Sequence, residues 1–333
     1  MKKRLALLLC AVLVVGMLAS CAAGEQPGGD SDQDLTLALV VAGTFGDRSF
    51  YDSSKAGCDK LAAEGVTVKT IECNNENHTQ QIRNAADAAN VVVLVGWEFY
   101  DVETIAPEYA DVRFIWIDNA TSAPVANVLN ITYAQNEGSF LAGYIAAKLS
   151  ESGVIGAVGG EDTATINDFI VGYEAGAQYA NPAVKVEVNY TNTYDDPAVG
   201  KECALALHEK GADVVFQIAS KAGDGVFDAA AEGGFYAIGV DSDQKYIAPD
   251  VIVCSMCKEV GESIYSAVKQ YMEKGDDCGL FGTTWTADMK SGLVGVGYGE
   301  DGSAQQVPDE VKAEAAALAE KIISGEIKVP TTR

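Results

Sequence analysis

Side chains that can bind a ligand follow several runs of valine and isoleucine in this sequence. They are Asp47, Ser49 and Phe50 in "GTFGDRSFYDSS" (43–54), Asp118 after "VRFIWI", and Asp241 after "FYAIGV". Carboxylates accept hydrogen bonds, and an aromatic ring offers a flat apolar face. Because ligands of parallel α/β sheets bind beyond the carboxyl ends of the strands, these residues are candidates for one binding site.

Each candidate also has a structural interpretation when it is taken alone. Asp47 and Asp118 could cap helices or form turns, for which aspartate is favoured. Phe50 could be an ordinary core residue. Asp241 and Asp243 form an Asp-X-Asp pattern, but this is a weak metal signal without further ligands. The combination, and no single residue, therefore indicates a binding site.

Further strand ends are polar or rich in glycine. They are "GWEF" (96–99), "GGED" (159–162) and "QIASKAGDGVF" (217–227). The last lacks the Gly-Lys-Ser/Thr of a phosphate-binding loop, and "GVGYG" (295–299) is not followed by the helical pattern of a dinucleotide site. These stretches do not predict nucleotide phosphate binding.

The cysteines and histidines offer one alternative chemistry. Cys254 and Cys257 form a Cys-X-X-Cys at a strand-to-helix junction, where a helix N-terminus can lower a thiol pKa, so a thiol oxidoreductase is the enzymatic alternative. The apolar run "VIVCSM" predicts instead that Cys254 is buried. His78 and His208 lie in different halves without a zinc-ligand pattern, which disfavours metal catalysis and a Ser/His/Asp triad. The cysteine spacing leaves disulfides undecided.

Two series of strands must position these residues. The first covers 35–42, 66–71, 91–95, 112–118 and 127–133, and the second covers 153–159, 184–190, 213–219, 235–241 and 250–256. Helical stretches alternate with them, which is the rhythm of an α/β protein with two wound sheets. Between the series, "NEGSFLAGYIAAKLS" (136–150) has one apolar stripe and predicts an amphipathic helix that begins the second lobe.

The N-terminal residues predict export. Lys2, Lys3 and Arg4 precede an apolar run too short to span a bilayer comfortably, as in a signal peptide (1–20). "LASC" ending at Cys21 resembles the bacterial lipobox, which implies lipidation of that cysteine. The alternative is an ordinary cleaved signal with a structural cysteine nearby. The polar stretch 21–34 has no apolar period and predicts a flexible tether.

The composition limits the ligand. The formal net charge is −25, and it becomes more negative when the cationic signal is removed. So acidic a surface repels phosphate backbones, which argues against nucleic acid and against strongly anionic ligands. A neutral or cationic small molecule is easier to accommodate.

Several segments in order resemble the basic membrane protein family. They are "GTFGDRSFYDSS" (43–54), "EGSFLAGYIAA" (137–147), "DFIVGYEAGAQYANP" (168–182), "GADVVFQIASKAGDGVFDAA" (211–230), "AIGVDSDQ" (237–244) and "CSMCKEV" (254–260). Members of that family are exported lipoproteins that bind substrates for ABC transporters and include purine nucleoside receptors. The resemblance implies the type I periplasmic-binding-protein fold, with two doubly wound α/β lobes joined by a hinge that closes on ligand. It places residues 35–134 and 254–285 in the first lobe and residues 135–253 and 286–333 in the second.

The resemblance also implies a set of ligand-binding residues. They are Asp47, Ser49, Phe50, Asp118, Phe216, Gly223, Asp241 and Lys258. In it, Phe50 is one aromatic face of a base sandwich and Phe216 is a candidate for the other. Asp241, with Lys258 beside it, accepts hydrogen bonds from ribose hydroxyls, and Asp47 and Asp118 contact the ring edge or fix the first-lobe loop.

The implied function is that of a lipid-anchored, extracytoplasmic receptor. It captures purine nucleosides between two closing lobes and delivers them to an ABC permease, without catalytic residues, metal or cofactor. The alternative ligand is a simple sugar or another nucleoside-like compound. A regulator built on the same fold is disfavoured, because the signal and tether place the chain outside the cytoplasm.

Overall fold

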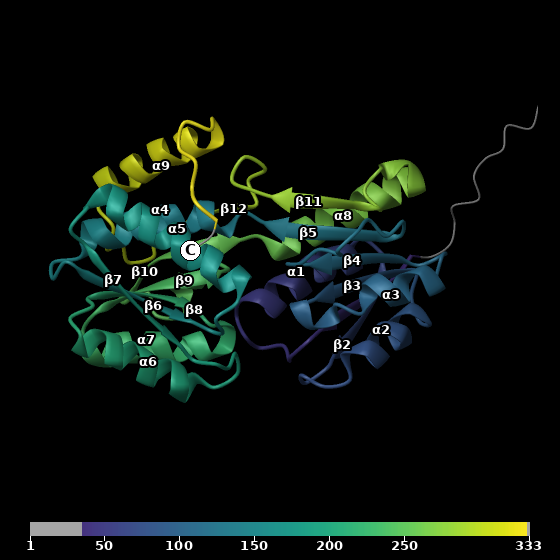
Figure 1. Cartoon of the computed structure of the whole chain (residues 1–333), viewed down its shortest axis with the longest axis horizontal. Coiled ribbons are helices and arrows are strands. Elements are labelled where there is room, and N and C mark those ends of the chain that lie inside the picture. Colours follow the sequence, from purple (N-terminus) through teal and green to yellow (C-terminus); the bar gives the residue numbers. More distant parts are fainter. Residues whose placement is uncertain (1–34, 332–333) are drawn as a thin grey trace, which may run out of the picture. The chain divides into compact units, whose positions relative to one another are not determined.

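The computed structural model describes residues 35–331, which form two α/β lobes (Figure 1). Each lobe is built around one six-stranded sheet. The predicted signal peptide, Cys21 and tether lie outside the described residues and stay predictions. Among the described residues, none of the helices has the length and apolar character needed to cross a membrane.

The first sheet is entirely parallel, with the strand order β2-β1-β3-β4-β5-β11. Its strands are β1 Thr36–Val41, β2 Thr67–Glu72, β3 Val91–Val95, β4 Arg113–Ile117, β5 Val128–Tyr133 and β11 Thr283–Ala287. The helices α1 Phe50–Ala63 and α8 Val260–Lys274 pack on one face, and α2 His78–Ala86 and α3 Val102–Ile105 pack on the other. The short 3-10 helices η1 Trp97–Phe99, η2 Ala106–Glu108 and η5 Gly275–Cys278 complete this lobe.

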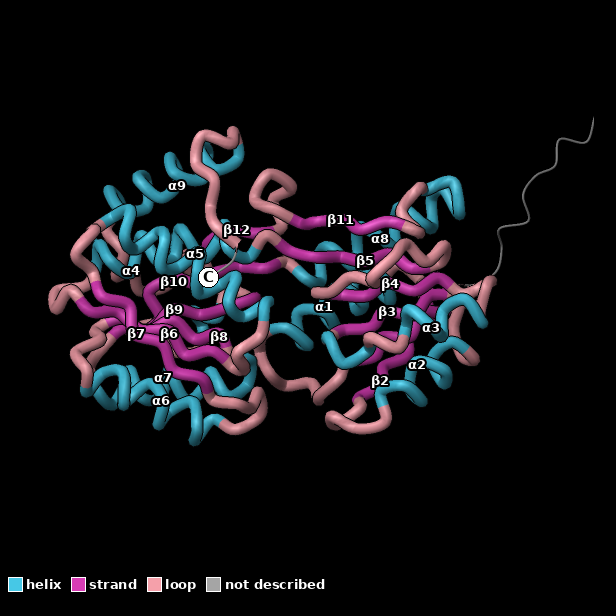
Figure 2. Tube along the Cα trace, viewed as in Figure 1, coloured by secondary structure: helices cyan, strands magenta, loops and turns pink. Residues whose placement is uncertain are grey.

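The second sheet repeats this order as β7-β6-β8-β9-β10-β12, with β12 antiparallel to β10. Its strands are β6 Val154–Gly159, β7 Lys185–Tyr190, β8 Val214–Ile218, β9 Tyr236–Asp241, β10 Ile252–Lys258 and β12 Val294–Gly297. The helices are α4 Gln135–Leu149, α5 Ala164–Ala180, α6 Pro197–Glu209, α7 Asp224–Gly233 and α9 Asp309–Ile323, with η3 Ser220–Gly223 and η4 Gln244–Tyr246. Figure 2 shows helices on both sides of the strands.

Coverage on both faces explains why the central strands were visible in the sequence. β3 "VVVLV" and β8 "VVFQI" are buried at every position, as parallel strands between two helical layers are. All ten predicted strands are present. The edge strands β11 "TTWTA" and β12 "VGVG" were not predicted, because the first is polar and largely exposed and the second is half glycine.

The chain passes between the two lobes at three places: from β5 to α4, from β10 to α8, and from β11 to β12. The helix predicted at 136–150 is α4 and packs on α5 in the second lobe. The expected boundary at 254 falls inside β10, which pairs with β9 up to Cys257 and therefore belongs to the second sheet. The boundary at 285/286 likewise cuts β11, whose whole length pairs with β5 in the first sheet.

Candidate functional site

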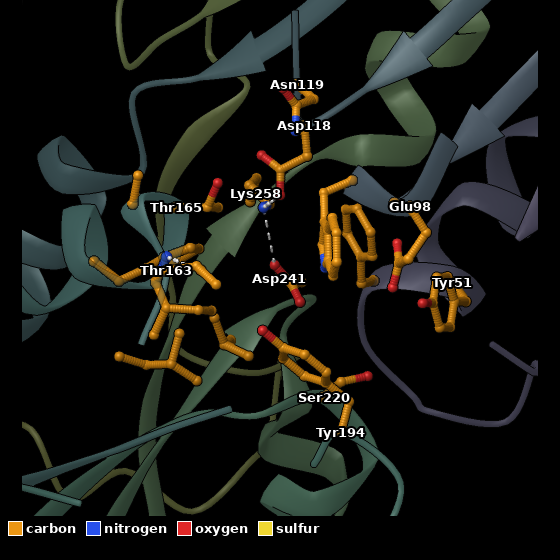
Figure 3. Close-up of a pocket in the computed structure, with 18 residues that line it drawn as sticks. Tyr51, Glu98, Asp118, Asn119, Thr163, Thr165, Tyr194, Ser220, Asp241 and Lys258 are labelled. Atoms are coloured by element: carbon orange, nitrogen blue, oxygen red, sulfur yellow. Dashed lines mark hydrogen bonds and ion pairs between the residues drawn. The ribbon is translucent and has the colours of Figure 1, made fainter. Parts of the chain in front are cut away.

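A cavity of ≈ 320 Å³ lies at the carboxyl ends of strands from both sheets (Figure 3). This volume is at the lower end of the range for small-molecule sites, about 300–1,000 Å³. Its wall includes the aromatic residues Phe50, Tyr51, Trp97, Phe169 and Tyr194 and the charged residues Glu98, Asp118, Asp241 and Lys258. Both lobes therefore supply aromatic and charged groups to one site.

The strand order explains why the cavity is here. In each sheet the order reverses direction beside its first strand, at β1 and β3 in the first lobe and at β6 and β8 in the second. Loops diverge at such a switch point and leave a crevice at the carboxyl ends of the strands. Tyr51 and Glu98 follow β1 and β3, whereas Thr163 and Ser220 follow β6 and β8, and all four line the cavity.

Lys258 is the centre of charge in the wall. It ends β10, is 2 % exposed, and its Nζ donates a hydrogen bond to Asp118 Oδ2 at 2.8 Å. Asp241 Oδ1 lies 3.8 Å from the same Nζ. A buried ammonium group is stable only when it is paired, and these two carboxylates pair it from opposite sheets.

Three aromatic rings surround the same ammonium group. Lys258 Nζ lies 4.9 Å from the centroid of Phe50, 5.1 Å from that of Phe169 and 5.2 Å from that of Tyr133. These distances are within the range of cation–π attraction. The rings cover the ammonium group, and the low local dielectric strengthens its ion pairs.

The backbone is left-handed at three wall residues other than glycine. Asp118 has φ 68°, Asp241 has φ 63° and Ser220 has φ 50°. Residues other than glycine rarely adopt this conformation, and such residues cluster at functional sites. Asp118 follows β4 and Asp241 ends β9, so this conformation occurs at the two strand ends where carboxylates line the cavity.

Asp241 is held by a contact from the other lobe. Ser49 Oγ donates to Asp241 Oδ2 at 2.6 Å. Burial raises the pKa of Asp241, whereas the charge of Lys258 and the Ser49 hydrogen bond lower it. Ser49 lies behind the carboxylate and is absent from the cavity wall.

Asp47 also joins the lobes without lining the cavity. It is 1 % exposed and accepts hydrogen bonds from the backbone N–H groups of Ser49, Tyr51 and Asp52. Ser220 Oγ donates to Asp47 Oδ2 at 2.9 Å across the lobes. Burial raises the pKa of Asp47 to about 6, against the effect of these hydrogen bonds. The geometry makes Asp47 an organiser of the β1–α1 loop, which corresponds to its structural interpretation.

Two other predicted residues lie away from the cavity. Phe216 is fully buried in the core, 5.3 Å from Tyr173 between ring centroids, because its side chain is on the α5 face of β8. Gly223 packs against Gln217, and a Cβ at this glycine would lie 1.8 Å from Gln217 Oε1. Neither residue lines the cavity, so the geometry gives no support to the expected ligand contacts of Phe216 and Gly223, which stay untested.

Other wall residues were missed as candidates. Phe169 supplies the second-lobe ring near Lys258 that Phe216 does not, but it lies five residues into α5 and follows no strand directly. Trp97 and Glu98 belong to the strand end "GWEF", which was recognised as polar but assigned no role. Trp97 lines the cavity and is still 49 % exposed. The strand-end rule, applied residue by residue, could have identified Trp97 and Glu98.

The cysteines do not form a reactive pair in the described residues. All six are free thiols, and Cys254 and Cys257 are both buried. Burial raises the pKa of Cys254 to about 12, which is opposite to the change that a nucleophilic thiolate needs. The geometry therefore does not support the oxidoreductase alternative.

The fold and this inter-lobe cavity are typical of periplasmic solute-binding proteins. Residues 35–333 match the family model described as "Bmp: ABC transporter substrate-binding protein PnrA-like". The chain belongs to this family of ABC-transporter substrate-binding proteins. It is 34 % identical to Basic membrane protein A of Borreliella afzelii, over 88 % of this chain and 91 % of that one, and 32 % identical to Basic membrane protein D of Borreliella burgdorferi strain JD1, over 96 % and 93 %.

Solved structures support the same assignment. An ABC transporter solute-binding protein from Aeropyrum pernix K1 is similar with a TM-score of 0.79 and 26 % identity, covering 89 % of this chain and 94 % of that one. One from Conexibacter woesei DSM 14684 has a TM-score of 0.72 and 24 % identity, covering 89 % and 99 %, and shows the fold alone. The type I periplasmic-binding-protein fold is thereby confirmed. The family implies a ligand and a membrane permease as partners.

Proposed function

We propose that this protein binds a purine nucleoside between its lobes and delivers it to the permease of an ABC transporter. The observation that carries the proposal is the composition of the cavity wall. Aromatic rings from both lobes line it, and the carboxylates of Asp118 and Asp241 converge on Lys258. A nucleoside has a flat base for the rings and sugar hydroxyls for the carboxylates.

The charges in the wall favour an uncharged ligand. Among the described lining residues, Lys258 is the one cation, and it is already paired with Asp118 and Asp241. Glu98 adds a further carboxyl. A phosphate group would meet acidic groups and no free cation, so nucleotides should bind much more weakly than nucleosides.

Each half of the ligand has its own binding residues in this proposal. Phe50 stacks on the base from the first lobe, and Phe169 and Tyr194 add aromatic surface from the second. Asp241 accepts hydrogen bonds from ribose hydroxyls beside Lys258. Because the two lobes hold different parts of one ligand, binding favours the state in which both lobes contact it.

Calorimetric titration tests this function directly. Inosine, guanosine, adenosine, ribose, hypoxanthine and inosine monophosphate are titrated into a fragment of residues 35–333, which contains every residue that the structure describes. We expect nucleosides to bind more tightly than ribose or free base, and the monophosphate to bind most weakly. Binding of ribose without any nucleoside would overturn the purine assignment and support the sugar receptor.

We also propose that the protein is anchored outside the cytoplasm through a lipid on Cys21. The support is the lipobox-like "LASC" after the apolar signal. In a bacterial host, the full chain should fractionate with membranes and carry a mass increase on its N-terminal cysteine. The Cys21→Ala variant should be uncleaved or shed. Membrane fractionation unchanged by this substitution, with an unmodified Cys21 in the wild type, would contradict the anchor.

A further inference from the structure

Glu98 is a cavity carboxyl with unused hydrogen-bonding capacity. It follows β3 at the switch point, and its Oε2 is buried without a hydrogen-bond partner among the described residues. Gly96 makes room for it, since a Cβ at that glycine would lie 2.4 Å from Glu98 Oε2. A buried acceptor without a partner is costly, and in native proteins it points to a missing donor.

The other carboxylates of the wall differ from Glu98 in this respect. Asp118 accepts a hydrogen bond from Lys258. Asp241 accepts one from Ser49 and lies near the same lysine. A ligand hydrogen-bonded to those two shares acceptors that already have partners. At Glu98 a ligand donor would supply a partner that the protein does not provide.

Tyr51 accompanies Glu98 at the same end of the cavity. Its ring packs over Gly43, where a Cβ would lie 3.0 Å from Tyr51 Cε2. Burial raises the pKa of Tyr51 and the charge of Glu98 raises it further, which places the two groups in electrostatic reach of each other. In Figure 3, Tyr51 and Glu98 lie together, away from Asp118, Asp241 and Lys258.

We propose that Glu98 and Tyr51 form hydrogen bonds with the edge of the base that is most distant from the sugar, and that they make guanosine the preferred nucleoside. This inference rests on the proposed function, in which Asp241 and Lys258 hold the sugar. The purine edge most distant from the sugar then points toward Glu98. A carboxylate accepts two adjacent N–H groups and the Tyr51 hydroxyl donates to a neighbouring oxygen, which matches the N1–H, N2–H and O6 of guanine.

The nucleosides differ at this edge in a way that makes the proposal specific. Inosine keeps O6 and N1–H but lacks the 2-amino group, and adenosine has an acceptor at N1 and an amino group in place of O6. A hydrogen bond to a charged group changes affinity by about 10- to 100-fold. We therefore expect guanosine to bind at least 10-fold more tightly than inosine, and inosine more tightly than adenosine.

Two variants and one control test the assignment by calorimetry at pH 7.5. Glu98→Gln removes the charge and one acceptor at constant shape, and should weaken guanosine by about 10- to 100-fold and adenosine by less than 3-fold. Tyr51→Phe should weaken guanosine and inosine by similar factors, because both carry O6. Glu161→Gln is the control, since Glu161 lies in electrostatic reach of Glu98 but outside the cavity wall. It should preserve the order of affinities.

The outcomes separate this inference from the proposed function. Tight nucleoside binding without preference for guanosine would overturn the role of Glu98 and leave the nucleoside function standing. An equal loss for all three nucleosides in Glu98→Gln, or the same loss of preference in Glu161→Gln, would also overturn it. Failure of the wild type to bind any nucleoside would overturn the proposed function and this inference with it.

Discussion

The two sheets have equivalent frameworks and unequal chemistry. β4 and β9 occupy the same place in their sheets, and the residues at their ends, Asp118 and Asp241, share the left-handed backbone conformation. The neighbouring strands β5 and β10 are also equivalent, but β5 ends in Tyr133 and β10 ends in Lys258. One lobe therefore supplies an aromatic ring at the position where the other supplies the cation.

This difference shows how a repeated fold makes one site instead of two. The Tyr133 hydroxyl is hydrogen-bonded to Ser263 at 2.6 Å, and its ring lies 5.2 Å from Lys258 Nζ. The first lobe therefore packs around the cation that the second lobe provides. A single ammonium group lies between a carboxylate from each sheet, so both lobes contribute to the ion pairs of the site.

The largest expected effect comes from removing the cation. Lys258→Met leaves the buried Asp241 and the partly buried Asp118 without their cationic partner. It should lower the free energy of unfolding by about 3–5 kcal/mol and abolish ligand binding. Urea denaturation and calorimetry measure the two effects. Unchanged stability would show that the carboxylates do not depend on Lys258.

A second buried lysine provides a matched control. Lys245 is also fully buried, but it donates to the backbone oxygens of Pro249 and Ile252 and to Gln306, away from the cavity. Lys245→Met should lower stability and leave ligand affinity in the folded protein within 3-fold. Equal losses of affinity in both variants would mean that Lys258 acts only through stability.

The next largest expected effect is the pH dependence of stability that Asp47 causes at the start of α1. Thr163 accepts a hydrogen bond from Ile166 N–H at the start of α5, and Asp47 has the corresponding role before α1, but only Asp47 can ionise. Its pKa is about 6 in the folded protein and about 4 when unfolded, so the folded state holds a proton between these values. This contribution to stability is complete below pH 4 and is lost as the pH rises through 6.

Urea unfolding at several pH values checks this prediction. The pKa difference corresponds to a change on the order of 3 kcal/mol between pH 4 and pH 7. Asp168, whose pKa burial also raises to about 6, contributes with the same sign, so Asp47→Asn should reduce the slope without abolishing it. Identical pH dependence in the wild type and this variant would show that Asp47 does not titrate as described.

Phe50 and Asp241 should affect different halves of the ligand. Asp241→Ala should weaken a nucleoside by about 1.5–3 kcal/mol and leave free base nearly unaffected. Phe50→Ala should weaken nucleoside and base alike, by about 1–3 kcal/mol, because only stacking is lost. Calorimetry with inosine and hypoxanthine separates the two patterns. Loss of thermal stability without ligand selectivity in either variant would assign that residue to loop support.

The smallest expected effect concerns the ion pair between Arg48 and Asp224, which joins the two lobes outside the cavity wall. Arg48 from the first lobe lies 2.5 Å from Asp224 of the second, and its side chain is 42 % exposed. Such pairs contribute less than about 1 kcal/mol, and salt screens them. At low salt, Arg48→Gln should weaken ligand binding by less than 5-fold. At 500 mM NaCl it should leave ligand binding unchanged. Calorimetry in both buffers measures the two affinities. A larger loss that persists at high salt would give Arg48 a direct role in the site.

The sequence predicted the framework better than the site because the two depend on different information. Buried parallel strands such as "VVVLV" are continuous apolar runs, so a single stretch identifies them. The strand-end rule and the family resemblance nominated Phe50, Asp118, Asp241 and Lys258 as site residues, and all four line the cavity. Whether they bind ligand stays a prediction that the experiments above address.

The predicted residues and the cavity wall differ where the direction of a side chain decides its surroundings. Phe216 and Phe169 are both aromatic residues of the second lobe near a strand end or helix start, but only Phe169 enters the wall. A strand pattern cannot show which face of β8 meets a ligand when both faces are buried. The strand end "GWEF" indicates the position of Glu98, but its unpartnered oxygen is a property of the packed structure that no sequence pattern shows.

The half-exposed Trp97 gives the protein an optical reporter of its own. Its indole lines the cavity, whereas Trp116 is in the core and donates to the Gly96 carbonyl at 2.8 Å, and Trp285 lies on the edge strand β11. Indole emission responds to the polarity of its surroundings and to a stacked ring. A bound base would replace water beside Trp97, whereas Trp116 and Trp285 are not in the cavity wall, so ligand occupancy can be followed by intrinsic fluorescence without a label.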